Sequence, residues 1–314
     1  MQNNGKVLIT DSVHPILLEG LAKAGFTCDY YPDISLAETR QQIDQYVGVI
    51  INSKVKVDRS FLDLSPQLKF IGRLGSGLEI IDLEYAAHKG VAVYNSPEGN
   101  RNAVAEHLVG MLLALANNLL PADREVRQKV WLREKNRGFE ISGKTIALIG
   151  FGHTGKAVAR RLAGFQMNIL AYDKYLTGFE GLYPHVVESE MQQIFEQADI
   201  VSFHLPLTDE TTSLVNLAYL KAFQKPFVLI NTSRGAVLNL KDLLIALDRK
   251  MVIGACLDVY ENEKPETFSA KEEEIYAKLY QLDNVVLSPH VAGWTHESKF
   301  RLARILLEKI LKGF

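Results

Sequence analysis

Several polar side chains that could carry chemistry stand directly after short apolar runs. They are His204, Arg234, Asp258, the pair Glu261 and Glu263, and His290. Ligands of open α/β sheets bind beyond the carboxyl ends of the strands, so these positions are candidates for a site. Hydride transfer between a nicotinamide and a C–OH carbon requires an acid/base, a cation that polarises the substrate, and a group that orients the base. A histidine, an arginine and a carboxylate meet these needs, and spacing alone leaves both His204 and His290 as the base.

A glycine-rich motif of the kind that binds dinucleotides follows an apolar run and opens a helical pattern. It reads Gly150-Phe151-Gly152-His153-Thr154-Gly155. Gly150 permits the tight turn, Gly152 lets the backbone approach a pyrophosphate, and Gly155 allows close packing of helix on strand. Asp173, 23 positions after Gly150, can accept hydrogen bonds from both ribose hydroxyls and would repel a 2′-phosphate. The motif therefore predicts NAD rather than NADP as the cofactor.

A second glycine cluster also follows a predicted strand. It reads Gly72-Arg73-Leu74-Gly75-Ser76-Gly77. Its order does not fit the dinucleotide fingerprint, but successive small residues can expose backbone N–H groups as a nest for an anion. From the residues alone, an anion nest and a plain turn are equally good interpretations.

The elements that must position these residues are short strands alternating with helices, which predicts βαβ units and parallel sheets. The expected strands of the first third are 6–10, 28–31, 47–51, 70–72 and 91–94. Those of the remainder are 145–149, 168–172, 200–204, 227–231, 254–258 and 285–288. The stretch Asn102–Asn118 is apolar on most faces, so we expect a buried helix at a domain junction. A last helix is expected near 295–311.

Composition narrows the classes of function. The chain has 314 residues, 35 basic and 37 acidic, which predicts about two domains and gives no reason to expect a nucleic-acid partner. Cys28 and Cys256 suit a reducing compartment. The longest apolar run, Leu108–Ala116, is short of the ~20 residues that span a bilayer, and the first residues do not read as a signal peptide. We expect a cytoplasmic protein with no membrane partner. Metal-ligand spacings and a serine-nucleophile elbow are absent from the sequence, so no metal is expected.

In combination, these blocks resemble the D-isomer-specific 2-hydroxyacid dehydrogenases, from Ile51 to Trp294. The matching blocks are Asn100–His107, the glycine motif, His204–Thr208, Asn231–Gly235 and Leu257–Glu263, followed by Pro289–Trp294. The resemblance implies an α/β protein of two doubly wound parallel-sheet domains. It implies a flavodoxin-like substrate domain, 1–97 plus 291–314, and a Rossmann NAD-binding domain, 98–290, with the active site in a cleft between them. It also implies a homodimer with the 102–118 region near the two-fold contact.

The resemblance implies a role for each matching side chain. His290 matches the acid/base, which resolves its competition with His204, and Glu263 matches the carboxylate that keeps this histidine protonated. Arg234 matches the arginine that binds the substrate's carboxylate and keto oxygen. Asp258 matches the residue that holds the nicotinamide carboxamide.

Further matching positions line the substrate and the cofactor. Ser76 and Gly77 fall where members of the family offer N–H groups to the substrate carboxylate, which favours the anion nest. Val104, His204 and Pro206 match positions that line the cofactor.

Three departures from the family pattern bear on the substrate and the base. The family commonly has E-x-E-P, whereas this chain reads Glu261-Asn262-Glu263-Lys264-Pro265. Counting from Asp258 selects Glu263 and counting back from the proline selects Lys264, of which only Glu263 can orient an imidazolium. Asn52 stands where phosphoglycerate dehydrogenases often have an arginine, although Lys54 and Arg133 could bind a substrate phosphate instead. We expect no C-terminal regulatory extension of the kind found in some phosphoglycerate dehydrogenases.

We therefore expect an NAD-dependent oxidoreductase that interconverts a small 2-keto acid and its D-2-hydroxy acid. One alternative is a D-3-phosphoglycerate dehydrogenase without the regulatory domain, which Asn52 weakens. Formate dehydrogenase fits less well because it has a glutamine at the position of Glu263. An alternative from another class is an NAD(H)-sensing interaction protein, because transcriptional corepressors share this fold.

Overall fold

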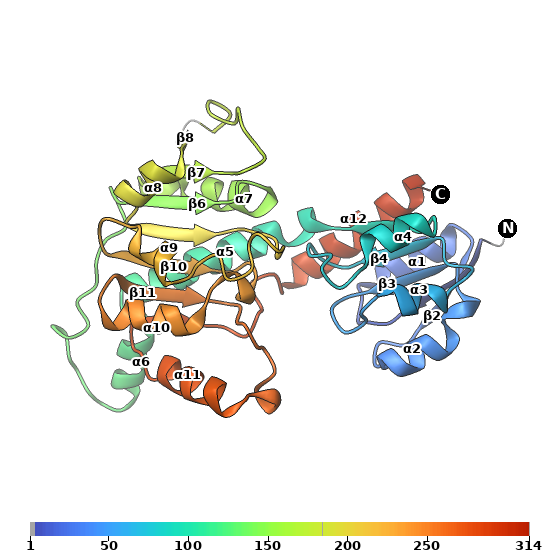
Figure 1. The fold of residues 1–314 in the computed structure, drawn as a ribbon, viewed down its shortest axis with the longest axis horizontal. Coiled ribbons are helices and arrows are strands. Elements are labelled where there is room, and N and C mark those ends of the chain that lie inside the picture. Colours follow the sequence, from blue (N-terminus) through green and yellow to red (C-terminus); the bar gives the residue numbers. More distant parts are fainter. Residues whose placement is uncertain (1–3, 184, 314) are drawn as a thin grey trace. The chain divides into compact units, whose positions relative to one another are not determined.

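A computed structural model describes residues 4–183 and 185–313. The chain divides into two compact units, the first comprising Met1–Arg101 with Trp294–Phe314 and the second Asn102–Gly293. Each unit is built on one parallel sheet with helices on both faces (Figure 1). The α/β class and the two doubly wound sheets expected from the sequence are confirmed. The assignment of substrate binding to 1–97 with 291–314, and of NAD binding to 98–290, remains a prediction.

The first unit contains a five-stranded sheet in the order β2-β1-β3-β4-β5, which is the flavodoxin-like order. Its strands are β1 (Gly5–Ile9), β2 (Phe26–Tyr30), β3 (Gly48–Ile51), β4 (Phe70–Arg73) and β5 (Ala92–Asn95). Its helices are α1 (Pro15–Lys23), α2 (Leu36–Gln42), α3 (Arg59–Asp63), α4 (Leu83–His88) and α12 (His296–Gly313).

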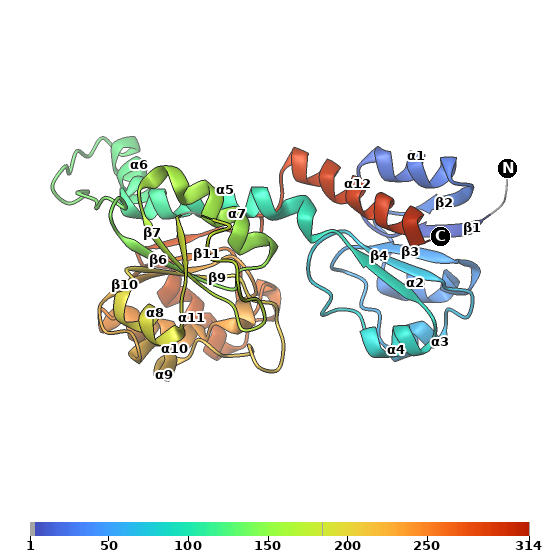
Figure 2. The same ribbon diagram turned by 90° about the horizontal axis from the view of Figure 1, so that it is seen from above.

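Alternate strand residues face two separate cores in this unit. Val7 and Ile9 pack with residues of α1 and α12, whereas Leu8 packs with residues of α3 and α4. Figure 2 shows α1 and α12 on one face of the sheet and α2, α3 and α4 on the other. Burial of both faces explains why the strands read as continuous apolar runs and not as alternating ones.

The second unit contains a seven-stranded parallel sheet in the order β12-β11-β10-β9-β6-β7-β8. Its strands are β6 (Thr145–Ile149), β7 (Asn168–Tyr172), β8 (Val186–Glu188), β9 (Ile200–Phe203), β10 (Phe227–Asn231), β11 (Val252–Leu257) and β12 (Val285–Leu287). The chain runs outward from β6 in one direction and then returns to β9 on its other side. The sheet therefore has its switch point between β6 and β9, where such folds bind ligands.

Helices cover both faces of the second sheet. They are α5 (Pro97–Ala116), α6 (Leu119–Arg127), α7 (His153–Leu162), α8 (Met191–Gln197), α9 (Leu217–Lys221), α10 (Leu240–Asp248) and α11 (Ala270–Tyr280). Leu108 of α5 and Val158 of α7 share one core with Ile146 and Leu148 of β6. The intervening residues of β6, Ala147 and Ile149, face the core formed with α8 to α11 (Figure 2).

Helix α5 occupies most of the stretch in which a long apolar helix was expected. Its buried residues include Ala105, Leu108 and Leu112, while Val109 and Leu113 stay half-buried. The helix ends before Asn118, which adopts a left-handed conformation (φ 50°) at the start of α6. Within the described residues, no single helix has the length and apolarity to cross a membrane. The pair α5 and α6 meets that test only together, with a bend of 64° between them.

Candidate functional site

The candidate residues of the second unit gather at the carboxyl edge of its sheet. Gly150 follows β6, Asp173 follows β7 and His204 follows β9. Arg234, Asp258 and His290 come after β10, β11 and β12. Because all seven strands are parallel, their ends lie along one edge of the sheet, as the sequence analysis required.

The surroundings of the three glycines of the motif differ, so a side chain would have a different effect at each. Gly150 has a φ of +96°, and a Cβ there would collide with the carbonyl oxygen of His204. A Cβ on Gly155 would collide with the carbonyl oxygen of Gly150, so this glycine lets α7 pack against the loop. A Cβ on Gly152 would meet no atom within 4 Å. No other residue therefore occupies the space that a side chain at 152 would fill, and a ligand could enter it.

The loop and the first turn of α7 form a cradle for an anion. Gly152 is the N-cap residue of α7 and has no side chain to occupy the first N–H groups of the helix. His153 and Thr154 form the first turn, in which the sequence places no acidic residue. The positive end of the helix dipole and these N–H groups are suited to a pyrophosphate.

Asp173 ties this cradle to the neighbouring strand. Its Oδ2 accepts a hydrogen bond from the N–H of Phe151 at 2.8 Å, and its Oδ1 accepts from those of Tyr175 (2.9 Å) and Leu176 (3.0 Å). A carboxylate has about four acceptor positions, so Asp173 keeps capacity for a ribose hydroxyl.

His290 and Glu263 form an ion pair. The Nδ1 of His290 lies 2.8 Å from the Oε2 of Glu263, and the two side chains are 48% and 38% exposed. Burial raises the pKa of the Glu263 carboxyl, but the hydrogen bond and charge of His290 outweigh it, so the net shift is downward. The N–H of Tyr260 donates to the other oxygen of Glu263 at 3.3 Å, which fixes the carboxylate in place.

This pairing shows which residue of the 261–265 segment contacts the imidazole, a choice that the sequence left between Glu263 and Lys264. Glu263, and not Lys264, lies on the imidazole. Glu261 has a separate task, because its Oε2 accepts the N–H of Leu240 at the start of α10, and burial raises the pKa of its carboxyl.

His204 lies in a different environment from His290. Its Nε2 is 3.1 Å from the Oγ of Ser202, and its Nδ1 is buried with no hydrogen-bond partner among the described residues. Burial lowers the pKa of His204 to about 4, so its imidazole is neutral at neutral pH. A neutral ring is a poor proton donor, and the geometry therefore favours His290 as the acid/base.

Arg234 lies close to the ion pair. Its charge is one of the causes that lower the pKa of Glu263, and its Nη1 donates to the carbonyl of Ser233 at 2.7 Å. The next residue must be a glycine, since a Cβ on Gly235 would collide with the backbone of Tyr260. This close approach brings the segment that carries Glu263 against the segment that carries Arg234.

Asp258 is 1% exposed and its carboxylate is largely occupied by the loop of His290. It accepts the Ser288 hydroxyl at 2.6 Å and the N–H groups of Val291 and Ala292 at 2.9 Å each. The His107 side chain joins this group from α5, with its Nε2 2.9 Å from the Ser288 Oγ. The sequence analysis placed His107 in the matching block 100–107 but predicted no role for it. Its partners Asp258 and Ser288 lie more than 150 positions away along the chain, so no local pattern links them.

The remaining cofactor candidates lie at the surface of the second unit or within it. Val104 is 8% exposed on α5. Pro206 is exposed after β9, where its carbonyl accepts the Thr211 hydroxyl at 2.7 Å. Among the described residues, no group of three or more His, Cys, Asp or Glu side chains could hold a metal ion.

The substrate candidates Ser76, Gly77 and Asn52 belong to the first unit. Gly75 has a φ of +151°, and the guanidinium of Arg73 lies where its Cβ would be. Neither the Ser76 nor the Gly77 N–H donates to another described residue, as an anion nest requires. Sequence reasoning missed Arg73, although its place inside the glycine cluster was a usable signal.

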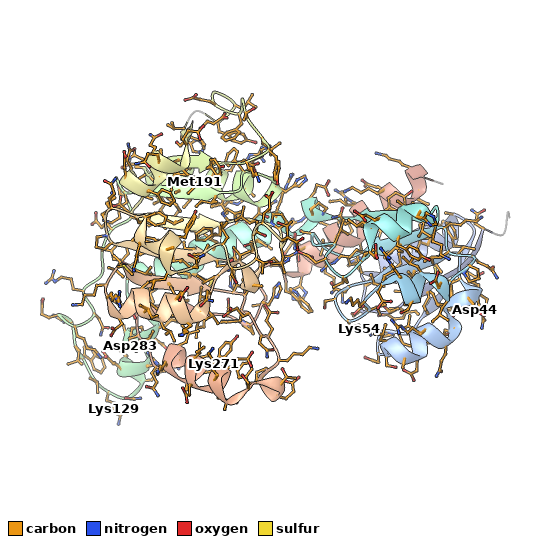
Figure 3. All side chains as sticks on the ribbon, viewed as in Figure 1. Asp44, Lys54, Lys129, Met191, Lys271 and Asp283 are labelled. Atoms are coloured by element: carbon orange, nitrogen blue, oxygen red, sulfur yellow. The ribbon has the colours of Figure 1, made fainter. Side chains whose placement is uncertain are left out.

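The loop after β3 carries Asn52 and Lys54. The N–H of Asn52 donates to the Oδ2 of Asp11 at 2.9 Å. Lys54, labelled in Figure 3, donates to the carbonyl of Pro32 at 2.5 Å and lies 4.0 Å from the Oδ1 of Asp11. The Asp11 carboxylate therefore stands beside both Asn52 and Lys54.

Comparison with known proteins identifies a family. Residues 109–292 match the family described as D-isomer specific 2-hydroxyacid dehydrogenase, NAD binding domain. A glyoxylate reductase of Thermofilum pendens is 37% identical over 82% of this chain and 76% of the relative. A hydroxypyruvate reductase of Thermotoga maritima is 34% identical over 84% of this chain and 83% of the relative.

Solved structures and longer relatives extend the comparison. The NADPH-dependent glyoxylate/hydroxypyruvate reductase of Sinorhizobium meliloti, solved with NADP and malonate, has a TM-score of 0.81 and 27% identity, covering 98% of this chain and 92% of its own. The D-3-phosphoglycerate dehydrogenase of Archaeoglobus fulgidus is 31% identical over 98% of this chain. The chain spans only 56% of that relative, or about half its length.

Proposed function

We infer that this chain, which belongs to the D-isomer-specific 2-hydroxyacid dehydrogenase family, interconverts a small 2-keto acid and its D-2-hydroxy acid with NAD as the hydride carrier. The observation that carries the proposal is the ion pair of His290 and Glu263 beside Arg234. An acid/base, its orienting carboxylate and a cation stand at the edge of a sheet that also offers a glycine cradle for a dinucleotide.

Each group of the triad has a distinct task in this proposal. Bound NADH supplies the hydride that reduces C2 of the keto acid. His290 gives its proton to the carbonyl oxygen as that oxygen becomes an alkoxide, while Glu263 holds the Nδ1 side of the ring and stabilises the imidazolium. Arg234 binds the substrate carboxylate and stabilises the charge that develops on the oxygen. In the reverse direction His290 accepts the hydroxyl proton.

We assign the cofactor to the residues that surround the switch point of the seven-stranded sheet. The glycine loop and the first turn of α7 hold the pyrophosphate. The Asp173 carboxylate holds the adenosine ribose and disfavours a 2′-phosphate. Asp258 retains one acceptor position, which suits the nicotinamide carboxamide, and Val104, His204 and Pro206 line the rest of the site.

The keto acid is proposed to use Ser76 and Gly77 for its carboxylate and the Asn52 loop for its distal group. Glyoxylate and hydroxypyruvate, the substrates named for two relatives, have small uncharged distal groups. Phosphohydroxypyruvate is the second candidate, favoured by the phosphoglycerate dehydrogenase relatives and by the Arg73 cation. Asn52 and the Asp11 carboxylate beneath it weaken this second candidate.

We further propose a homodimer in the cytoplasm. Apolar side chains are exposed along α6 and the segment that follows it. They are Leu119, Leu120, Val126, Val130, Trp131 and Leu132, with Trp131 67% exposed. A patch of this kind favours contact with another protein surface, and a second copy of the chain is the partner that the family resemblance implies. The free thiols of Cys28 and Cys256 suit a reducing compartment.

The test is NADH oxidation by the purified chain with glyoxylate, hydroxypyruvate, phosphohydroxypyruvate, pyruvate and larger 2-keto acids. We expect turnover with at least one, and loss of at least about a hundredfold in kcat for His290→Ala with NADH still bound. A wild-type chain that binds NADH tightly but turns over no keto acid would support the NAD(H)-sensing interaction protein. A strict preference for phosphohydroxypyruvate would establish the phosphoglycerate dehydrogenase alternative.

A further inference from the structure

A chain of hydrogen bonds runs from α5 to the loop that carries His290. The Nε2 of His107 lies 2.9 Å from the Oγ of Ser288, and this Oγ lies 2.6 Å from the Oδ1 of Asp258. A serine hydroxyl has one proton, and the short contact with a carboxylate requires it there. The Nε2 of His107 must then donate to the serine oxygen, which fixes the direction of the chain and the tautomer of the ring when it is neutral.

The end of this chain holds the backbone on both sides of His290. Asp258 accepts Ser288 two residues before His290, and it accepts the N–H groups of Val291 and Ala292 directly after it. His290 itself has a φ of +56°, a left-handed conformation that is unfavourable for a residue with a Cβ. The buried carboxylate therefore holds an unfavourable backbone conformation that points the imidazole at Glu263.

We propose that His107 is a positioning residue for His290, acting through Ser288 and Asp258. The inference rests on the proposed function for its catalytic consequence. By donating to Ser288, His107 keeps the serine proton directed at Asp258, and its own Nε2 lies 3.7 Å from the Asp258 Oδ1. The carboxylate then stays oriented toward the two N–H groups that hold the His290 loop.

The hydrogen bond that His107 donates can be tested without disturbing the packing of α5. The core contact of this helix is made by apolar residues such as Leu108 and Leu112, which are fully buried, whereas the His107 side chain is 28% exposed. Replacement of His107 removes one donor and little of the core. Glutamine can place an amide N–H near the position of Nε2 and so replace the donor without the ring.

The experiment compares His107→Ala and His107→Gln with Glu106→Ala as the matched control. Glu106 is the preceding residue of α5, is exposed, and pairs with Arg161. Two measurements are made on each variant: kcat and KM with the best keto acid of the wild type, and amide hydrogen exchange of Val291 and Ala292 by NMR. Thermal unfolding reports any general loss of stability.

For His107→Ala we expect kcat to fall about tenfold, KM for NADH to stay within about twofold, and exchange at Val291 and Ala292 to quicken about tenfold, as for one lost hydrogen bond. His107→Gln should recover most of both effects, and Glu106→Ala should match the wild type. Unchanged exchange in His107→Ala overturns the proposal, as does a glutamine variant as impaired as the alanine one. If the wild type turns over no keto acid, the exchange measurement still decides whether His107 holds the loop, so that failure of the proposed function is recognised separately.

Discussion

The sharpest test of the dinucleotide cradle is Gly152→Ala, because Gly152 is the one glycine of the motif at which a Cβ would collide with no other residue. A Cβ there meets no atom within 4 Å, and the φ of −76° is one that alanine adopts readily, while the ψ of −147° lies outside the main β region. Exchanging glycine for alanine at an N-cap costs on the order of 1 kcal/mol or less. The folded chain should therefore tolerate the change with a small drop in its unfolding temperature.

Cofactor binding should respond much more strongly. The added methyl group would stand where the pyrophosphate approaches the first N–H groups of α7. A hydrogen bond to a charged group is worth about 2 kcal/mol. Loss of one such bond corresponds to about thirtyfold weaker binding, and loss of two to about a thousandfold. Fluorescence titration with NADH measures the Kd, and thermal unfolding of the cofactor-free chain measures the stability.

Gly164→Ala is the matched control. Gly164 lies beyond the other end of α7, and a Cβ there also meets no atom within 4 Å. We expect it to bind NADH like the wild type. A Gly152→Ala chain that binds NADH within about threefold of the wild type would refute the assignment of the cradle. So would equal weakening by the two variants, since that would point to a general effect of alanine near α7.

Three further predictions concern the acid/base, the pH dependence of stability, and assembly. Glu263→Gln should lower kcat for keto-acid reduction about tenfold to a hundredfold while KM for NADH stays nearly constant, because the imidazolium loses its counter-charge; an unchanged kcat would exclude Glu263 as the orienting group. The pKa of His204 is lowered to about 4 from an ordinary 6.5, so the unfolded chain takes up a proton in this window that the folded chain does not. Above pH 6.5 the free energy of unfolding does not vary with pH through this group, and it should fall by up to about 3 kcal/mol as the pH drops to 4. The His204→Asn variant should lose this part of the fall when the denaturant midpoint is plotted against pH. Leu120→Glu should yield monomers in sedimentation velocity if the exposed apolar patch is the dimer contact; a wild type that is itself monomeric would contradict the homodimer.

The sequence predicted the strands correctly where both faces of the sheet are buried, because such strands consist mainly of apolar residues. β6, β7 and β10 have the expected bounds because each consists of four consecutive apolar residues with one polar residue at an end. β8 was missed, since Val186–Glu188 is only three residues long and Val187 is exposed. The equally short edge strand β12 was expected because all three of its residues are apolar, whereas β8 ends in a glutamate.

The site was only partly readable, because its electrostatics depend on contacts between distant residues. His204 and His290 are both histidines, and each follows a strand of the second sheet. What separates them is the desolvation that lowers the pKa of His204 and the carboxylate that lies beside His290, neither of which spacing encodes. The partners of Asp258 were likewise hidden, since Ser288 and Val291 lie about 30 positions away along the chain.

The left-handed backbone of His290 restricts which side chains could ever take over its position. Histidine, asparagine and aspartate enter this conformation more readily than other residues with a Cβ, whereas a β-branched or bulky residue is strongly disfavoured there. A redesigned acid/base at this position is thus restricted to these three residue types, and only histidine has a side chain that titrates near neutral pH. An enzyme engineer who wants a different proton donor at this edge of the sheet would have to remodel the loop backbone first and choose the side chain second.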